Sequence, residues 1–157
     1  MKISLFAVGK TSYPFVQDGC NLYYKRLIHY TKFEEVIIED VKKAGNLSPD
    51  QLKQEEGKKI LARIEASDFV VLLDENGKSF NSNQFADWIA QKQVQSTSHL
   101  IYIIGGAYGF SPELYERANM RLQLSAMTFS HQIIRSIFAE QLYRAFTIIK
   151  GEPYHNN

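Results

Sequence analysis

Short runs of apolar and β-branched residues recur along the chain and predict buried strands. Four of them lie at residues 2–8, 33–39, 69–73 and 100–104, and a weaker one lies at 121–125. The first four begin about thirty residues apart, which is the length of a strand–helix–strand unit. The pattern therefore predicts parallel strands joined by helical crossovers.

Three stretches between these runs have helical character, at residues 14–30, 48–66 and 81–93. Ser48 is the expected N-cap of the second stretch, with Pro49 at its first helical position. An Asn/Ser cluster precedes the third and can cap it in the same way. The alternation predicts an α/β fold in a single domain over residues 1–157, with a mostly parallel sheet flanked by helices.

The last predicted helix, residues 130–149, is the most apolar. Its apolar stripe is wider than one face requires: Ile133, Ile134, Ile137, Phe138, Leu142, Ala145, Phe146 and Ile149. The other side is expected to carry Arg135, Glu140, Tyr143 and Arg144. A stripe of this width indicates burial against the sheet and against a second subunit. The tail after it, "GEPYHNN", is predicted to be an unstructured end.

Composition narrows the function classes. The chain has 18 basic and 17 acidic residues and a net charge of +1, so it has no global electrostatic footprint for nucleic acid. An RNA partner would need local positive charge, or charge assembled from more than one chain. The single cysteine, Cys20, excludes an internal disulfide framework and fits the cytosol. The apolar runs are too short to span a bilayer.

The sequence "IIGGAYGFS" at 103–111 places three glycines directly after a predicted strand. The loop could be a plain bend, a phosphate cradle or a seat for another ligand. Its G-G-x-x-G spacing is not that of a dinucleotide-binding turn, and no acidic residue lies near 127–129 to hold a ribose. Glycines at the carboxyl end of a strand favour close approach of a ligand over a plain turn.

Two other motifs resemble known sites but fail on spacing. In "LLDENGKS" (72–79), a P-loop would need glycine where Leu72 stands, so "DENGK" is predicted to be a tight turn that leaves the strand. The histidines, His29, His99, His131 and His155, have no metal-ligand spacing, so no metal site is expected. No Ser-His-Asp arrangement follows from the spacings either.

Several polar residues near the carboxyl terminus allow two interpretations. Ser125, Thr128, Ser130 and His131 could simply cap the last helix, or could present donors to a ligand. Arg144 has Glu140 four residues earlier as an ion-pair partner. Tyr154 and His155 could be frayed, or could stack on and hydrogen-bond to a base. The residues alone leave these alternatives open.

Four motifs in order resemble one family: "LDENGK", "IIGGAYGFS", "LSAMTFSHQIIR" and "EQLYRAFTIIKGEPYHN". The chain resembles the RlmH-type bacterial methyltransferases of the SPOUT class over essentially its whole length. The resemblance implies a C-terminal trefoil knot from about residue 70, a cytoplasmic homodimer and S-adenosylmethionine as methyl donor. It implies methylation of N3 of a pseudouridine in 23S ribosomal RNA. Because so small a net charge disfavours binding of naked RNA, we expect the substrate to be the assembled ribosome. The alternative is a non-catalytic α/β module that binds a nucleotide or RNA.

The resemblance also implies roles for particular residues. The matching cofactor-binding positions are Leu73, Gly106, Ser125, Ala126, Met127, Thr128, Phe129 and Ser130. A side chain at Gly106 is expected to obstruct the bent cofactor. The residues implied for catalysis are His131, Arg144, Tyr154 and His155, with no metal. Tyr154 and His155 would lie over the substrate base, and Arg144 would face phosphate or developing negative charge.

Overall fold

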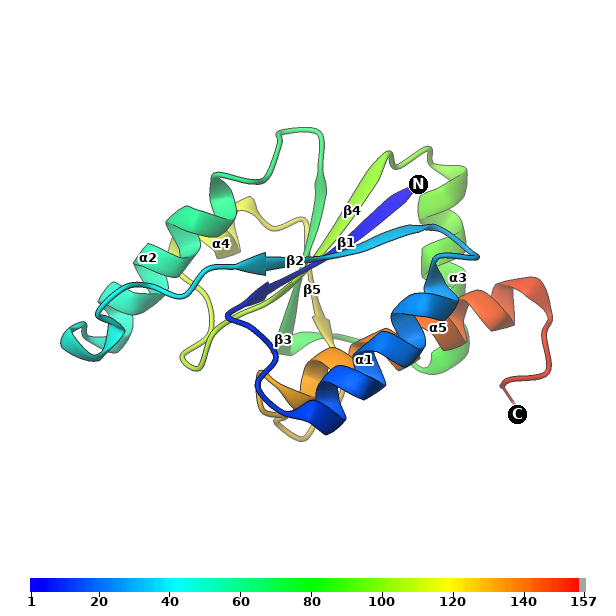
Figure 1. Cartoon of the computed structure of the whole chain (residues 1–157). Coiled ribbons are helices and arrows are strands. Elements are labelled where there is room, and N and C mark those ends of the chain that lie inside the picture. Colours follow the sequence, from blue (N-terminus) through cyan, green and yellow to red (C-terminus); the bar gives the residue numbers. More distant parts are fainter. Residues whose placement is uncertain (156–157) are drawn as a thin grey trace.

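The computed structural model describes residues 1–155. Its elements, in order, are β1 (Lys2–Val8), α1 (Pro14–Leu27), β2 (Lys32–Ile38), the short 3₁₀ helix η1 (Ala44–Asn46), α2 (Pro49–Leu61), β3 (Phe69–Ser79), α3 (Ser82–Val94), β4 (His99–Ile104), α4 (Pro112–Arg117), β5 (Met120–Gln123) and α5 (Ile133–Lys150). The five strands form one sheet in the order β2-β1-β4-β3-β5, and each neighbouring pair is parallel (Figure 1). The predicted α/β fold with a parallel sheet is confirmed.

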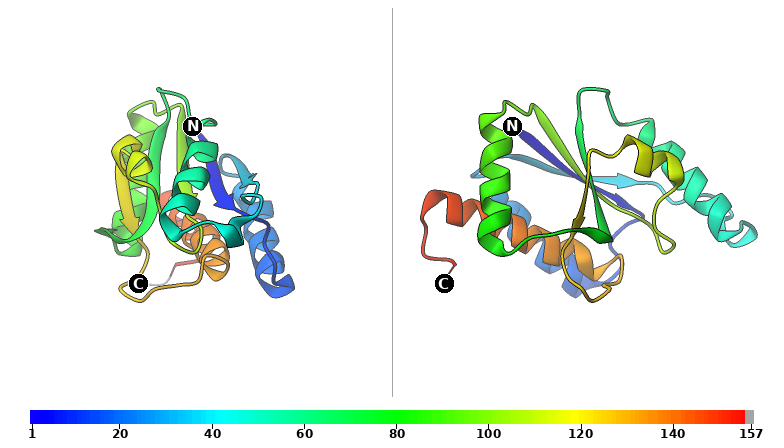
Figure 2. Two further views of the ribbon diagram at one scale, coloured as in Figure 1. Left: turned by 90° about the vertical axis from the view of Figure 1, so that its left-hand side faces the viewer. Right: turned by 180° about the vertical axis from the view of Figure 1, so that it is seen from behind.

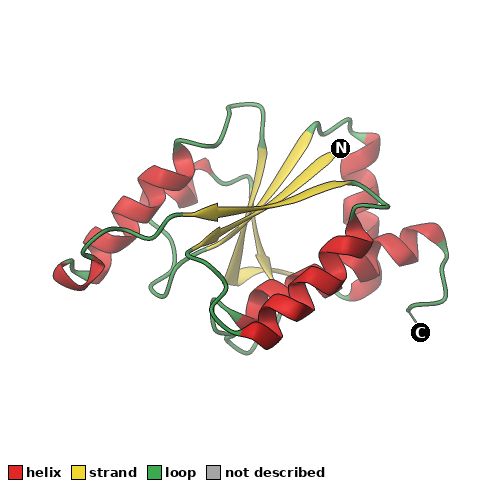
Figure 3. Ribbon diagram, viewed as in Figure 1, coloured by secondary structure: helices red, strands yellow, loops and turns green. Residues whose placement is uncertain are grey.

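Helices cover both faces of the sheet, as the views from the side and from behind show (Figure 2). Helices α1, α3 and α5 pack together on one face, and α2 and α4 pack on the other (Figure 3). Two apolar clusters fill the spaces between sheet and helices, one on each face. The central strand β4 contributes to both, with Leu100, Tyr102 and Ile104 in one and Ile101 and Ile103 in the other. Alternating side chains of a buried strand thus serve two cores.

The helix starts follow the predicted caps. Ser48 accepts a hydrogen bond from Gln51 N, and the Gln51 side chain accepts one from Ser48 N, which completes a capping box. Asn81 and Gln84 form the same arrangement at the start of α3. Helices α1 and α2 end earlier than predicted, and the short helix α4, capped by Ser111, was not predicted.

The prediction of a tight turn at "DENGK" is wrong. Strand β3 runs on to Ser79, with an irregularity where Leu122 of β5 pairs with both Leu73 and Lys78. At Gly77 the two backbones come so close that an added Cβ would lie 2.6 Å from Arg121 C. Pairing with β5 on both sides of residues 74–77 keeps this segment in the sheet and bulges it outward.

Two predictions for the carboxyl-terminal region also need correction. Arg135 was expected on the outer side of the last helix, but its side chain is fully buried, whereas Ile133 of the apolar stripe is 39% exposed. Backbone carbonyls at the carboxyl end of β1 accept hydrogen bonds from Arg135 and make its burial possible. The tail is ordered as far as it is described: Gly151 ends α5 with φ 67°, and Tyr154 turns back to Glu140. Residues 156–157 lie outside the described part.

Candidate functional site

A pocket of about 520 Å³ lies at the carboxyl ends of β4, β3 and β5, which are neighbours in the sheet. Three segments build it: residues 73–76 of β3, residues 104–110 after β4 and residues between 122 and 134 after β5. The carboxyl ends of parallel strands are where open α/β sheets bind ligands, because the loops diverge there and leave a crevice. Its size suits a small-molecule ligand.

The glycine segment is a tight backbone turn and a wall of the pocket at once. Gly109 N donates to Gly106 O at 3.2 Å, and Gly109 has a φ of 83°, which favours glycine. A Cβ added to Gly105 would lie 3.1 Å from Gly109 O. Both glycines are therefore needed for the turn, which presents its backbone to the pocket.

At Gly106 a side chain would fit only if the end of a neighbouring side chain moved. A Cβ built on Gly106 would lie 2.5 Å from Oε2 and 2.6 Å from Oε1 of Glu56, which projects from α2. The Glu56 side chain is buried, with 8% of its surface exposed. Burial, then the charge of Asp40, raises the pKa of Glu56. The obstruction seen in the structure is thus with a carboxylate behind the loop.

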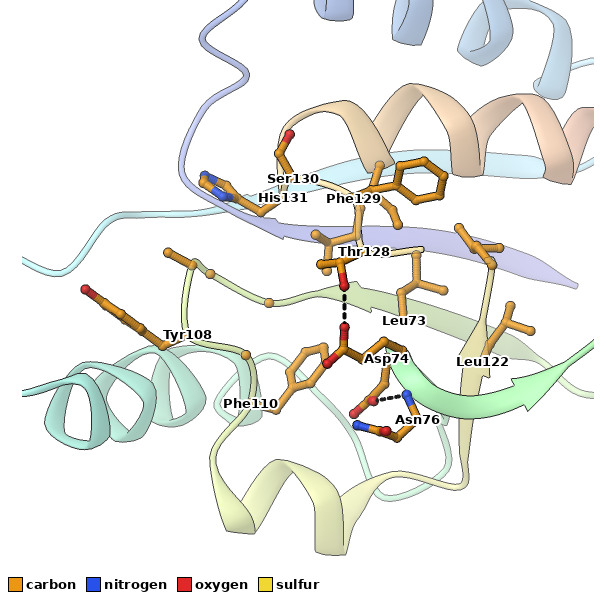
Figure 4. A pocket seen from close by; sticks show the side chains of 18 of the residues that line it. Leu73, Asp74, Asn76, Tyr108, Phe110, Leu122, Thr128, Phe129, Ser130 and His131 are labelled. Carbon is orange, nitrogen blue, oxygen red and sulfur yellow. Dashed lines mark hydrogen bonds between the residues drawn. The ribbon is translucent and has the colours of Figure 1, made fainter. Parts of the chain in front are cut away.

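Acidic residues of the segment predicted to be a turn stand on the opposite wall. Thr128 Oγ1 donates to Glu75 Oε2 at 2.6 Å and joins the two pocket segments (Figure 4). Asp74 accepts hydrogen bonds from Asn76 N and from the hydroxyl of Tyr115, both at 2.7 Å. Burial, then the bond to Asp74, raises the pKa of Tyr115 to about 12. The bulge of β3 places these side chains on the pocket wall. In the sequence, the motif "LDENGK" was the one signal that pointed to them.

The residues expected to hold a cofactor lie mostly on this pocket. Leu73, Gly106, Ser125, Met127, Thr128, Phe129 and Ser130 line it, and so does His131. Ala126 is exposed and is not among the lining residues. Figure 4 shows Leu73 and Leu122 on one side, with Thr128, Phe129, Ser130 and His131 on the segment above them. The pocket wall therefore combines apolar side chains with hydroxyl and acidic groups.

The other three residues expected to act in catalysis form a separate group in the second half of α5 and the turn after it. Arg144 Nη2 donates to Glu140 Oε1 at 2.5 Å, and Arg144 Nη1 lies 3.3 Å from His155 Nδ1. The Tyr154 hydroxyl donates to the same Glu140 oxygen at 3.1 Å.

Burial, then hydrogen bonding to Tyr23 and the charge of Glu140, raises the pKa of Tyr154. Eleven helical residues separate Ile133 from Arg144, which at 1.5 Å each is roughly 16 Å. One chain therefore carries the expected residues in two groups: His131 at the pocket, and Arg144, Tyr154 and His155 away from it.

A further polar network lies at the opposite end of the sheet. His99 Nε2 lies 2.7 Å from Ser4 Oγ, and His99 Nδ1 lies 2.8 Å from Asp68 Oδ1. Spacing gave no sign of this Ser-His-Asp arrangement, because the three residues come from three separate segments. Ser4 is fully buried and also donates to Glu34 at 2.8 Å, so a substrate cannot reach it. The network joins β1, β2 and β4.

Within residues 1–155, the structure has no group of three or more His, Cys, Asp or Glu residues placed to hold a metal ion. In that same part of the chain, no helix has both the length and the apolarity needed to cross a bilayer.

The chain matches the family model described as "Predicted SPOUT methyltransferase" over residues 1–155. It is 51% identical to the ribosomal RNA large subunit methyltransferase H of Christiangramia forsetii, over 99% of each chain. It is 49% identical to the protein of the same name from Cytophaga hutchinsonii, over 99% of this chain and all of the relative.

A methyltransferase structure from Legionella pneumophila, solved with bound SAM, matches 95% of this chain and 66% of its own at 10% identity. Its TM-score of 0.43 is too low to carry an argument. The full-length match to the family model and the identities near one half carry the assignment instead. The chain belongs to the SPOUT methyltransferase family.

Proposed function

We propose that this protein is an S-adenosylmethionine-dependent methyltransferase that methylates N3 of a pseudouridine in 23S rRNA of the large ribosomal subunit. The observation that carries the proposal is the full-length identity of about one half to relatives named ribosomal RNA large subunit methyltransferase H. The pocket at the carboxyl ends of β4, β3 and β5 supports it, because it offers a ligand site of suitable size in the expected place.

The pocket fits such a cofactor in chemistry as well as in size. Its walls are apolar at Leu73, Phe129 and Ile134, and the glycine turn leaves backbone groups open beside them. In the proposal, Leu73, Gly106 and the segment Ser125–Ser130 hold the cofactor, with Ala126 contributing through the backbone of that segment. When bound, the cofactor supplies a methyl group already activated by its sulfonium, so the chain needs no metal for this chemistry.

The protein itself must align N3 of the base with the methyl group, exclude water from the site and allow the N3 proton to leave. N3 of the base carries a proton that must leave before or during attack, and a nearby base or cation lowers that barrier. His131 lies on the pocket wall and can serve there. Arg144 faces phosphate or the developing negative charge, and Tyr154 and His155 lie over the base.

The separation of the two groups along α5 supports a homodimer in which the partner subunit completes each site. One chain cannot bring Arg144 to its own pocket without unwinding the helix between them. Exposed apolar side chains, Phe15 and Leu22 on α1 and Ile133 at the start of α5, supply surface for such contact. The proposal includes one SPOUT domain over the chain, knotted from about residue 70, and action in the cytoplasm on assembled ribosomes.

The test is methyl transfer from labelled S-adenosylmethionine to ribosomes that lack the modification, with protein-free 23S rRNA in parallel. Label in large-subunit RNA from ribosomes alone is the expected result. Equal labelling of free RNA would overturn the ribosome requirement. Cofactor binding without transfer to either substrate would favour the non-catalytic binding module.

A matched pair of variants tests the residue roles. Arg144→Ala should reduce turnover strongly and leave cofactor affinity nearly unchanged. Lys150→Ala, an exposed cation on the same helix, should change neither. Full turnover by Arg144→Ala would remove that residue from the proposed site, and Tyr154→Ala and His155→Ala are judged in the same way.

A further inference from the structure

Arg135 is a buried cation next to the pocket that the proposed chemistry does not use. Its side chain is fully buried on the first turn of α5. Four donated hydrogen bonds hold its guanidinium: Nη2 to Val8 O at 2.7 Å, Nη1 to Gly9 O at 2.9 Å and to Thr11 Oγ1 at 3.2 Å, and Nε to His131 O at 3.1 Å. Every acceptor is a neutral oxygen.

These bonds join two segments that are far apart in sequence. Val8 ends β1 and Gly9 opens the segment before α1, whereas His131 belongs to the pocket wall. Gln132 adds a second connection: its Oε1 accepts from Ser12 N at 2.8 Å, and its Nε2 donates to Lys10 O at 3.2 Å. Neighbouring residues of the pocket segment are thus fixed to the β1–α1 segment, residues 9–13.

Burying the charge of Arg135 costs desolvation free energy, which an apolar side chain filling the same space would not. Burial lowers the pKa of Arg135, and the charges of Glu35 and Asp40 only partly offset that effect. An apolar side chain of similar volume can often replace a buried charge without loss of stability. A rigid fork of donors can, however, hold three carbonyls in one geometry, and neither an apolar side chain nor the point charge of lysine can do so.

We propose that Arg135 is a positioning residue for methyl transfer, which sets the place of His131 and couples the β1–α1 segment to the cofactor pocket. The proposal rests on the proposed function, because His131 and the pocket acquire their roles there. Cofactor binding against residues 124–131 then changes the mobility of residues 9–13 through the hydrogen bonds of the Arg135 guanidinium. In the β1–α1 segment, Lys10 and Tyr13 are exposed to solvent.

The test compares Arg135→Lys and Arg135→Gln with Phe138→Leu. Phe138 is fully buried on the same helix and packs on Tyr102, so its truncation lowers stability without touching the four bonds. Cofactor affinity is measured by calorimetry, kcat and KM by methyl transfer, and backbone exposure by hydrogen exchange at residues 9–13 with and without cofactor. Urea unfolding gives the stability of each variant.

Both Arg135 variants should bind cofactor about ten-fold more weakly, because hydrogen bonds to a charged group are lost. The unsubstituted protein should show cofactor-dependent protection of residues 9–13, and both Arg135 variants should lose it. Phe138→Leu should keep both properties at equal or greater loss of stability.

Affinity and protection that merely follow stability across all three variants would overturn the positioning role. Unchanged affinity in a folded Arg135→Gln would overturn it as well. Absence of cofactor binding by the unsubstituted protein would instead refute the proposed function, so the two failures are distinguishable.

Discussion

The carboxylate of Glu56 occupies the position that a side chain at Gly106 would need. The distance from an ideal Cβ at Gly106 to Glu56 Oε2 is 2.5 Å, whereas two unbonded atoms of these types require more than 3 Å. Glu56 comes from α2, on the face of the sheet opposite α5. The glycine turn is therefore supported from behind by a buried acid while its backbone faces the pocket.

This contact predicts that Gly106→Ala lowers stability by about 1–3 kcal/mol, the usual cost of overpacking a tight site. The φ of Gly106 is not in the left-handed region, so alanine meets no backbone strain there. The double variant Gly106→Ala, Glu56→Ala should regain part of the loss, measured by urea unfolding.

Cofactor affinity of that double variant separates two reasons for the glycine. Recovery of affinity together with stability would assign the requirement to Glu56. Recovery of stability alone would favour obstruction of the cofactor, as the family resemblance implies.

Glu56 also predicts a pH dependence. Burial and the charge of Asp40 raise its pKa in the folded protein above the ordinary value of 4.5. The folded state thus binds this proton more tightly than the unfolded state, and its contribution to stability falls as pH rises through that window. Glu56→Gln should be relatively more stable than the unsubstituted protein at neutral pH, with the advantage shrinking toward pH 4. Parallel stability curves for the two proteins would contradict this.

Mixing two inactive variants tests the shared site. In a dimer whose sites combine residues of both chains, a mixed dimer of His131→Ala and Arg144→Ala has one damaged site and one intact site. Random exchange of equal amounts should restore about a quarter of the sites. If each site drew both residues from one chain, every site in the mixture would lack one of them. No recovery of methyl transfer after verified subunit exchange would therefore exclude the shared arrangement.

The network at the other end of the sheet should matter for stability alone. His99→Ala removes the partner of the buried Asp68 and of Ser4, so a loss of about 1–3 kcal/mol is expected. Cofactor affinity should stay unchanged, because the pocket lies at the opposite ends of the strands. An unfolding midpoint equal to that of the unsubstituted protein would show that the network contributes nothing.

Local patterns in the sequence were enough to predict the elements. Apolar runs marked every strand, although β3 continues six residues beyond its predicted end. The Ser48 and Asn81 caps marked two helix starts, because these signals act between neighbours in the chain. The motif order also carried the family, and the glycine turn was placed correctly after a strand. Lining residues such as Leu73 and Thr128 followed from that resemblance.

What spacing could not reveal depends on contacts between distant segments. From the sequence, Arg135 is predicted to lie on the surface, but the carbonyls of Val8 and Gly9 allow its burial. Likewise "DENGK" is predicted to be a turn, but pairing with β5 keeps it in the sheet. The role of Gly106 changes in the same way once α2 delivers Glu56. Tertiary structure decided these points because contacts between residues more than forty positions apart in the sequence leave no local signal.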